Sequence, residues 1–123
     1  MAHQLLIIDD HPLVRQALAS DFQALGYVVQ VACNGQEALR LLEHFTPDVI
    51  VLDFHMPVMD GREFMQRYCQ RAEPRAPVVL ISANGPVEQL ARSIGADTGL
   101  AKDPNPEPLY QAVARLAVAP SSE

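Results

Sequence analysis

Four short runs of hydrophobic residues recur along the chain, and each is bounded by polar or turn-forming residues. Three of them are continuously aliphatic, as is typical of parallel strands buried on both faces. The run at 28–31 is mixed, which favours a strand at the edge of a sheet, and a weaker fifth run follows at 98–101. We predict strands at Leu5–Ile8, Val28–Val31, Val49–Leu52, Val78–Ile81 and Thr98–Ala101.

Between these runs, hydrophobic residues recur at the spacing of three and four that is typical of amphipathic helices. The residues that form the five stripes are Val14, Leu18, Phe22 and Leu25; Ala38, Leu41, Leu42 and Phe45; Phe64, Met65 and Tyr68; Val87, Leu90, Ala91 and Ile94; and Leu109, Ala112, Val113 and Leu116. Residue types suited to helix ends flank them. These are Pro12 in a first turn, the N-cap pairs Asn34 with Glu37 and Asp60 with Glu63, and the C-cap glycines Gly26 and Gly95.

Strands and helices are thus predicted to alternate five times. Strict alternation with short loops favours a doubly wound α/β domain, in which helices cover both faces of a parallel sheet. The length of 123 residues suits a single domain. We assign residues 1–119 to it and 120–123 to a C-terminal tail or the start of a linker.

Ionisable or hydroxyl side chains follow four of the five predicted strands. Asp9 and Asp10 follow the first, Asp53 the third, Ser82 the fourth and Lys102 the fifth. Chemistry in such sheets collects beyond the carboxyl ends of the strands. We therefore expect these side chains to lie close together.

Three converging carboxylates would repel one another unless a cation lies between them. Oxygen ligands of this kind suit Mg²⁺, which often bridges carboxylates to a phosphate. Lys102 is the chain's only lysine, and its ammonium suits contact with a phosphoryl oxygen. A carboxylate can itself accept a phosphoryl group. The sequence therefore predicts metal-assisted phosphoryl transfer to a carboxylate.

This set of residues resembles the response-regulator receiver domains of two-component systems. The run at 53–61, Asp-Phe-His-Met-Pro-Val-Met-Asp-Gly, is similar to that family's D-x-x-M-P-x-M-D-G signature. The resemblance covers essentially the whole chain. It implies a flavodoxin-like (βα)5 fold with strand order 2-1-3-4-5.

The resemblance also implies roles. Asp53 would accept the phosphoryl group from a sensor histidine kinase or a phosphotransfer protein. Mg²⁺ would bind to Asp10, Asp53 and the backbone carbonyl of His55, and to Asp9 largely through water. Lys102 and Ser82 would contact the phosphoryl oxygens. The surface of the fourth helix, fifth strand and fifth helix would then change and address an output domain or protein; weak homodimerisation there is a further family expectation.

Four other positions bear on the roles that the resemblance implies. Asn84 occupies a place that tunes hydrolysis in the family, and the small Ala83 leaves access to the acceptor. We assign to Leu100 the position of the family's switch aromatic, whose ring a leucine lacks. Asp103 stands where the family has a proline after its lysine, so we expect a reshaped loop, in which Asp103 pairs with Lys102 or repels phosphate.

Composition excludes several other classes. The formal net charge of −6 argues against a nucleic-acid surface. No hydrophobic run approaches the roughly 20 residues of a membrane span, and the two cysteines lack metal-ligand spacing, so we expect a cytoplasmic protein with reduced thiols. A phospho-independent interaction module is the main alternative. A turnover enzyme such as a haloacid-dehalogenase-like phosphatase is disfavoured because His55 replaces the second acid of that motif, so we expect self-phosphorylation and self-dephosphorylation only.

Overall fold

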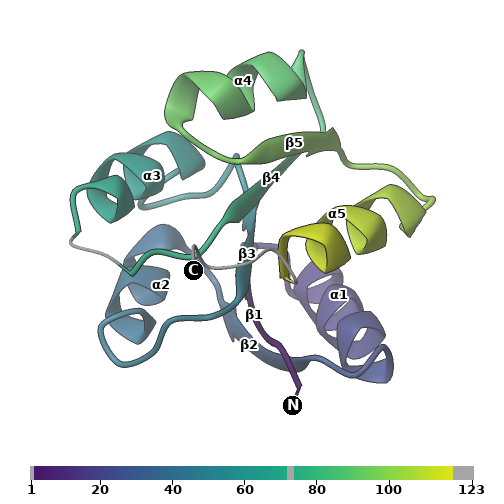
Figure 1. Ribbon diagram of the computed structural model, residues 1–123. Helices are drawn as coiled ribbons and strands as arrows, with labels where there is room; N and C mark the ends of the chain where they lie inside the picture. The colour runs from purple at the N-terminus through teal and green to yellow at the C-terminus, as the bar shows by residue number, and fades with distance from the viewer. Residues whose placement is uncertain (1, 72–73, 118–123) are drawn as a thin grey trace.

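A computed structural model describes residues 2–71 and 74–117, so the predicted tail at 120–123 lies outside the described residues. Five strands alternate with five helices (Figure 1). None of the described helices is long and apolar enough to cross a membrane. The elements are β1 (Gln4–Ile8), α1 (Pro12–Ala24), β2 (Val28–Ala32), α2 (Gly35–Leu41), β3 (Val49–Asp53), α3 (Gly61–Cys69), β4 (Val78–Ser82), α4 (Val87–Ile94), β5 (Thr98–Ala101) and α5 (Glu107–Ala117).

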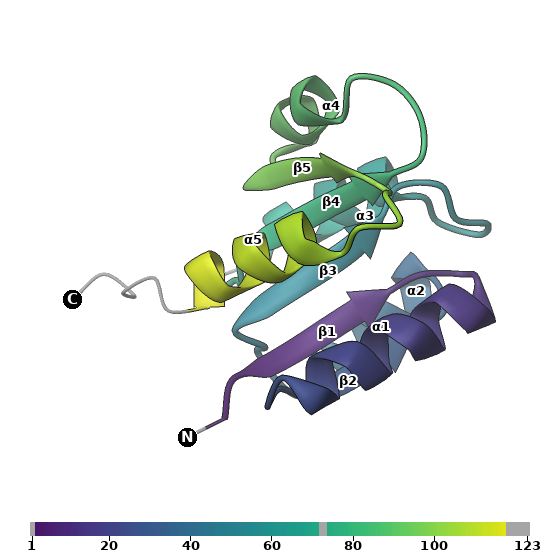
Figure 2. The same ribbon diagram turned by 90° about the vertical axis from the view of Figure 1, so that its right-hand side faces the viewer.

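The five strands form one parallel sheet in the order β2-β1-β3-β4-β5. Helices α1 and α5 cover one face, and α2, α3 and α4 cover the other (Figures 1 and 2). The predicted flavodoxin-like α/β fold is confirmed, and β2 lies at the edge, as its mixed composition indicated. Parallel strands need crossover connections, so each helix returns the chain to the same end of the sheet.

Alternate residues of the central strands supply two separate hydrophobic cores. Leu6, Ile8, Ile50, Leu52 and Leu80 pack toward α2, α3 and α4. Leu5, Ile7, Val49, Val51 and Ile81 pack toward α1 and α5. Burial on both faces explains why these strands are continuous aliphatic runs.

The predicted helix ends are mostly confirmed. The Asn34 side chain accepts a hydrogen bond from the Glu37 N–H at 2.8 Å, and Asp60 does the same for the Glu63 N–H at 3.0 Å. Gly95 caps α4 in the left-handed conformation with φ 87°. The side-chain oxygens accept hydrogen bonds from N–H groups that have no partner within the helix, and glycine adopts the left-handed conformation at the helix end without a steric penalty.

Two predicted stripes extend beyond what the helices bury. Phe22 is the buried residue of α1, whereas Val14 and Leu25 are 37% and 55% exposed, because they lie near the two ends of the helix, beyond its packing against the sheet. The prediction that Phe45 belongs to the second helix is wrong, because α2 ends at Leu41. It still packs against the core from the following turn.

Candidate functional site

The carboxyl ends of β1, β3, β4 and β5 meet at one edge of the sheet, as their loops in Figure 2 indicate. Asp9 and Asp10 follow β1 directly, Asp53 and Ser82 are the last residues of β3 and β4, and Lys102 follows β5. Parallel pairing of β3 with β1 and β4 aligns these ends. The fold thereby forms an acidic pocket from Asp9, Asp10 and Asp53, with Lys102 at its side.

Lys102 bridges two of the buried carboxylates. Its Nζ lies 3.2 Å from Asp53 Oδ1 and 3.5 Å from Asp9 Oδ2. Asp53 and Asp9 are 2% and 0% exposed. A single positive charge therefore faces two buried negative charges, with Asp10 adding a third carboxylate at the rim.

Each of the three aspartates keeps one buried oxygen without a hydrogen-bond partner among the described residues: Asp9 Oδ2, Asp10 Oδ1 and Asp53 Oδ2. Leaving a charged oxygen buried and unpaired is costly. Oxygens of this kind are the ligands that Mg²⁺ prefers. The donor set thus fits a divalent cation, which would be held by Asp9, Asp10 and Asp53.

Burial and the neighbouring Asp9 charge raise the pKa of Asp53 from 3.8 to about 6, although Lys102 acts in the opposite direction. Desolvation and a like charge both disfavour the ionised form of a carboxyl group. The metal-free pocket therefore stores unfavourable electrostatic energy near neutral pH.

This raised pKa predicts how stability depends on pH. A group whose pKa is higher in the folded state binds protons more tightly there, so its contribution to stability declines as the pH rises from about 4 through about 6. We expect Asp53→Asn to raise the free energy of unfolding at about pH 7.5 in EDTA by about 1–2 kcal/mol. Two pKa units correspond to about 3 kcal/mol, and loss of the Lys102 pair offsets part of this.

Urea denaturation of both proteins at about pH 4 and about pH 7.5 measures the difference. The gain should largely disappear at the lower pH, where the wild-type carboxyl group is protonated in the folded state and about half protonated in the unfolded state. Saturating Mg²⁺ should stabilise the wild type more than the variant. An equal effect of the substitution at both pH values would contradict the raised pKa.

Ser82 is fully buried and takes part in a turn. Its Oγ donates to the Asn84 carbonyl at 3.1 Å and accepts from the Asn84 N–H at 3.3 Å. The Ser82 hydroxyl therefore forms its hydrogen bonds with the Asn84 backbone in this conformation, and not with Asp53. Ala83 and Asn84 are exposed beside it, and the His55 ring is exposed and meets Phe54 edge-on.

Comparison with known proteins decides the family. The profile of the response regulator receiver domain matches residues 5–114. The chain is a response regulator receiver domain.

Relatives of this receiver domain include both a regulatory protein and a sensor kinase, and both are longer than this chain. It is 37% identical over 116 residues to the positive alginate biosynthesis regulatory protein of Pseudomonas aeruginosa, covering 92% of this chain and 46% of the relative. It is 36% identical over 115 residues to the sensor histidine kinase RcsC of Salmonella typhi, covering 92% of this chain and 12% of the kinase. The chain thus spans less than half the length of either relative.

Solved structures share the fold of this receiver domain. The chemotaxis response regulator CheY4 of Vibrio cholerae superimposes with a TM-score of 0.85 and 31% identity, covering 94% of this chain and 99% of that one. The response regulator TrrA of Thermotoga maritima, solved in complex with Mg²⁺ and BeF, gives 0.84 and 29% over 94% and 99%. The family and fold inferred from the sequence are therefore confirmed.

The receiver domain places Leu100 on the opposite face of the sheet from Ser82. Leu100 pairs with Ile81 and packs with it toward α5. The β5 residues on the face of Ser82 are Gly99 and Ala101, because side chains alternate along a strand. The β5 positions on the face of Ser82 are therefore not held by Leu100, to which we assigned the position of the switch aromatic.

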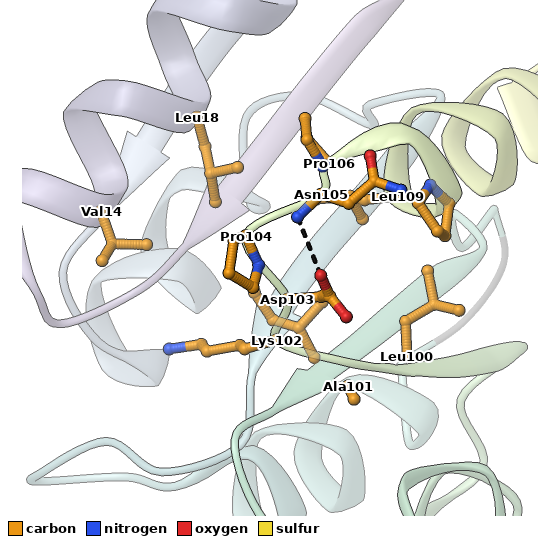
Figure 3. Close-up of a pocket in the computed structure, with 12 residues that line it drawn as sticks. Val14, Leu18, Leu100, Ala101, Lys102, Asp103, Pro104, Asn105, Pro106 and Leu109 are labelled. Atoms are coloured by element: carbon orange, nitrogen blue, oxygen red, sulfur yellow. Dashed lines mark hydrogen bonds between the residues drawn. The ribbon is translucent and has the colours of Figure 1, made fainter.

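The Asp103 carboxylate turns into its own loop. Its Oδ1 accepts a hydrogen bond from the Asn105 N–H at 2.8 Å (Figure 3). Asn105 Oδ1 in turn accepts a hydrogen bond from the Glu107 N–H at 3.1 Å. These two turns lead into α5. Lys102 meanwhile points to Asp9 and Asp53, so the expected pairing of Asp103 with Lys102 is not what the structure contains.

Sequence reasoning missed two residues that hold the pocket together. Arg15 Nη1 donates to the Asp9 carbonyl at 2.8 Å, and the His11 N–H donates to Asp9 Oδ1 at 2.9 Å. The His11 side chain is 65% exposed, and its ring also lies 3.3 Å from Asp10 Oδ1. Its position directly after the acidic pair, at the N-cap of α1, is the signal that could have indicated this.

A mostly apolar groove of about 550 Å³ lies beside the acidic pocket, between α1 and the loop from β5 to α5. Val14 and Leu18 line it from α1, and Pro104 and Leu109 line it from the loop and α5 (Figure 3). Lys102 contributes to its wall as well as to the acidic pocket. The exposure of Val14 therefore places an apolar surface directly beside the site.

Proposed function

We propose that this receiver domain takes a phosphoryl group from a phosphohistidine onto Asp53, with Mg²⁺ bound beside it. The donor would be a sensor histidine kinase or a phosphotransfer protein. One observation carries the proposal: Asp53 is buried with Oδ1 on Lys102 and with Oδ2 unpaired beside two further carboxylates. A carboxylate without such a role would be costly to keep there.

In this reaction a carboxylate oxygen of Asp53 attacks phosphorus. A P–O bond forms, the P–N bond to the donor imidazole breaks, and the imidazole leaves with its electron pair and takes up a proton. Lys102 offsets negative charge on the phosphoryl oxygens, and Mg²⁺ held by Asp9, Asp10 and Asp53 would supply further neutralisation of that charge. The burial of Asp53 limits competing water.

Ser82 is the group that would respond to the new phosphate. Its hydroxyl would leave the turn with Asn84 and donate to a phosphoryl oxygen, which loosens the β4–α4 loop. Phosphorylation adds roughly −1.5 to −2 charges, enough to shift a surface with two alternative packings. We assign this response to α4, β5 and α5, the candidate surface for an output domain or protein and for weak self-association.

Beryllofluoride, a mimic of the phosphoryl group, tests the proposal directly. We expect it to bind with Mg²⁺ and to shift amide NMR signals at Asp53, Ser82 and Lys102 and along α4 and β5, whereas Mg²⁺ alone should shift only the pocket. The complex of TrrA with Mg²⁺ and BeF supports the choice of probe. An unchanged spectrum would favour the phospho-independent interaction module instead.

Hydrophobic residues around the pocket suit the docking of a phosphate donor. Leu13 at the start of α1 and Val58 in the β3–α3 loop are 80% and 72% exposed. Val58 has φ 70°, an uncommon conformation for a β-branched residue. Exposed apolar groups on the segments that follow the pocket residues of β1 and β3, one of them in a strained conformation, indicate an interaction surface.

We expect the double variant Leu13→Ala with Val58→Ala to slow phosphotransfer from a phosphorylated kinase domain by about tenfold, the equivalent of 1.4 kcal/mol of docking energy. Its reaction with acetyl phosphate should not change, because the pocket is intact. The matched control is Leu25→Ala at the other end of α1, which is also exposed. Equal slowing with both donors would place the defect in the pocket rather than in docking.

A further inference from the structure

The imidazole of His11 lies among the carboxylates of the acidic pocket. One potential ligand atom from each of Asp9, Asp10, His11 and Asp53 lies within 4.8 Å of the others. His11 Nδ1 is 3.3 Å from Asp10 Oδ1 and 3.7 Å from Asp9 Oδ1. Opposite ligands of an octahedral ion such as Mg²⁺ stand about 4.0–4.2 Å apart and neighbouring ligands about 3 Å apart, so movements of at most about 1–2 Å would complete a four-ligand site.

The backbone of His11 is fixed, while its ring is accessible. Its N–H donates to Asp9 Oδ1, and its carbonyl accepts from the Arg15 N–H at 2.9 Å. The side chain makes no capping hydrogen bond to α1 and is 65% exposed. The ring can therefore rotate toward the pocket without a change in the fold.

The unpaired oxygens of the pocket provide a second, independent indication of a bound ion. Asp9 Oδ2 and Asp53 Oδ2 are buried, accept no hydrogen bond among the described residues and belong to side chains that are 0% and 2% exposed. Lys102 contacts Asp9 Oδ2 and Asp53 Oδ1, so Asp53 Oδ2 keeps neither that contact nor a hydrogen bond among the described residues. An ion placed there would touch carboxylates on one side and His11 at the rim.

We propose that His11 is a metal ligand of this receiver domain and that it shifts the preference of the site from Mg²⁺ toward a divalent first-row transition ion such as Mn²⁺. Mg²⁺ takes oxygen ligands almost entirely, whereas first-row transition ions accept imidazole nitrogen more readily, and Mn²⁺ is the transition ion that also suits carboxylate oxygens. The inference deepens the proposed function, since the same pocket would serve phosphorylation. It concerns which ion the pocket selects.

Pulsed EPR of the Mn²⁺-loaded wild-type protein at about pH 8 tests this proposal, because the imidazole must be deprotonated to bind. We expect a coupling from a directly bound ¹⁴N nucleus, lost in His11→Ala and retained in His44→Ala, a change at an exposed histidine outside the pocket. Mn²⁺ is preferred to Zn²⁺ as the probe because Cys33 and Cys69 are exposed free thiols, which bind Zn²⁺.

Calorimetric titration gives a second readout. His11→Ala should weaken Mn²⁺ binding by about tenfold or more, while Mg²⁺ affinity should stay within about twofold. Absence of nitrogen coupling, or equal loss for both ions, would overturn the inference and leave the phosphoryl-acceptor proposal intact. Nitrogen coupling in a protein that acetyl phosphate never modifies would support the inference and contradict the phosphoryl-acceptor role.

Discussion

Asp53→Asn should abolish phosphorylation of this receiver domain by acetyl phosphate in the presence of Mg²⁺. The amide is close in size to the carboxylate, so the pocket should remain folded, but it is a far weaker nucleophile. The other two pocket carboxylates cannot replace it, because Asp9 is fully buried behind Lys102 and Asp10 lies at the rim beside His11. No other acid of the pocket has an oxygen on Lys102 with its second oxygen open.

Intact-protein mass spectrometry after incubation with acetyl phosphate measures this result. The control is Asp60→Asn, since Asp60 is an exposed acid at the same edge of the sheet and asparagine serves equally well as its N-cap. That variant should be phosphorylated like the wild type. Modification of Asp53→Asn at the wild-type rate would mean that another residue is the acceptor.

The second large effect is expected on stability, at the contact between β5 and α4. A Cβ atom at Gly99 would lie 2.5 Å from the Val87 carbonyl oxygen and 2.9 Å from the Ala91 Cβ. Both neighbours belong to α4, and a backbone carbonyl cannot rotate away as a side chain can. Gly99→Ala should therefore push α4 off the sheet and lower the free energy of unfolding by about 2–3 kcal/mol.

Urea denaturation measures this loss, with Gly35→Ala as the matched control. The three atoms nearest to a Cβ at Gly35 would all belong to the Met59 side chain, with Sδ at 2.9 Å, and the thioether end of that flexible side chain can move. We expect the control to change stability by less than about 1 kcal/mol. If Gly99→Ala were equally mild, α4 would be loosely seated on β5.

Under the proposed function, the position of Gly99 would also bear on signalling. Its lack of a side chain lets α4 lie directly against β5, on the face of the sheet that carries Ser82. A change at Ser82 would reach α4 through the β4–α4 loop and this backbone contact. Folded Gly99→Ala protein should therefore show a displaced α4 in amide NMR spectra before beryllofluoride is added.

Local pattern was sufficient for much of this protein. Aliphatic runs and helical stripes predicted all five strands and the order of the helices. A strand buried on both faces is a continuous hydrophobic run, whereas a helix buried on one face has hydrophobic residues every three to four positions. The Asp-Asp pair, Asp53 and Lys102 were predictable as partners because parallel strands bring their carboxyl ends to one edge. The N-cap pairs were equally readable, since capping is a contact over three residues.

Tertiary structure alone decided the contacts between distant segments. The side of β5 that Leu100 occupies depends on its pairing with Ile81, and a shift of one residue would have reversed it. The division of the Asp53 oxygens between Lys102 and an open position depends on three strands at once. The adjacency of His11 and Asp10 could be read from the sequence, whereas the 3.3 Å between their side-chain atoms depends on the angle at which α1 leaves the sheet. The sequence thus determined which groups gather at the strand ends, and the packing of the chain decided which of their atoms meet.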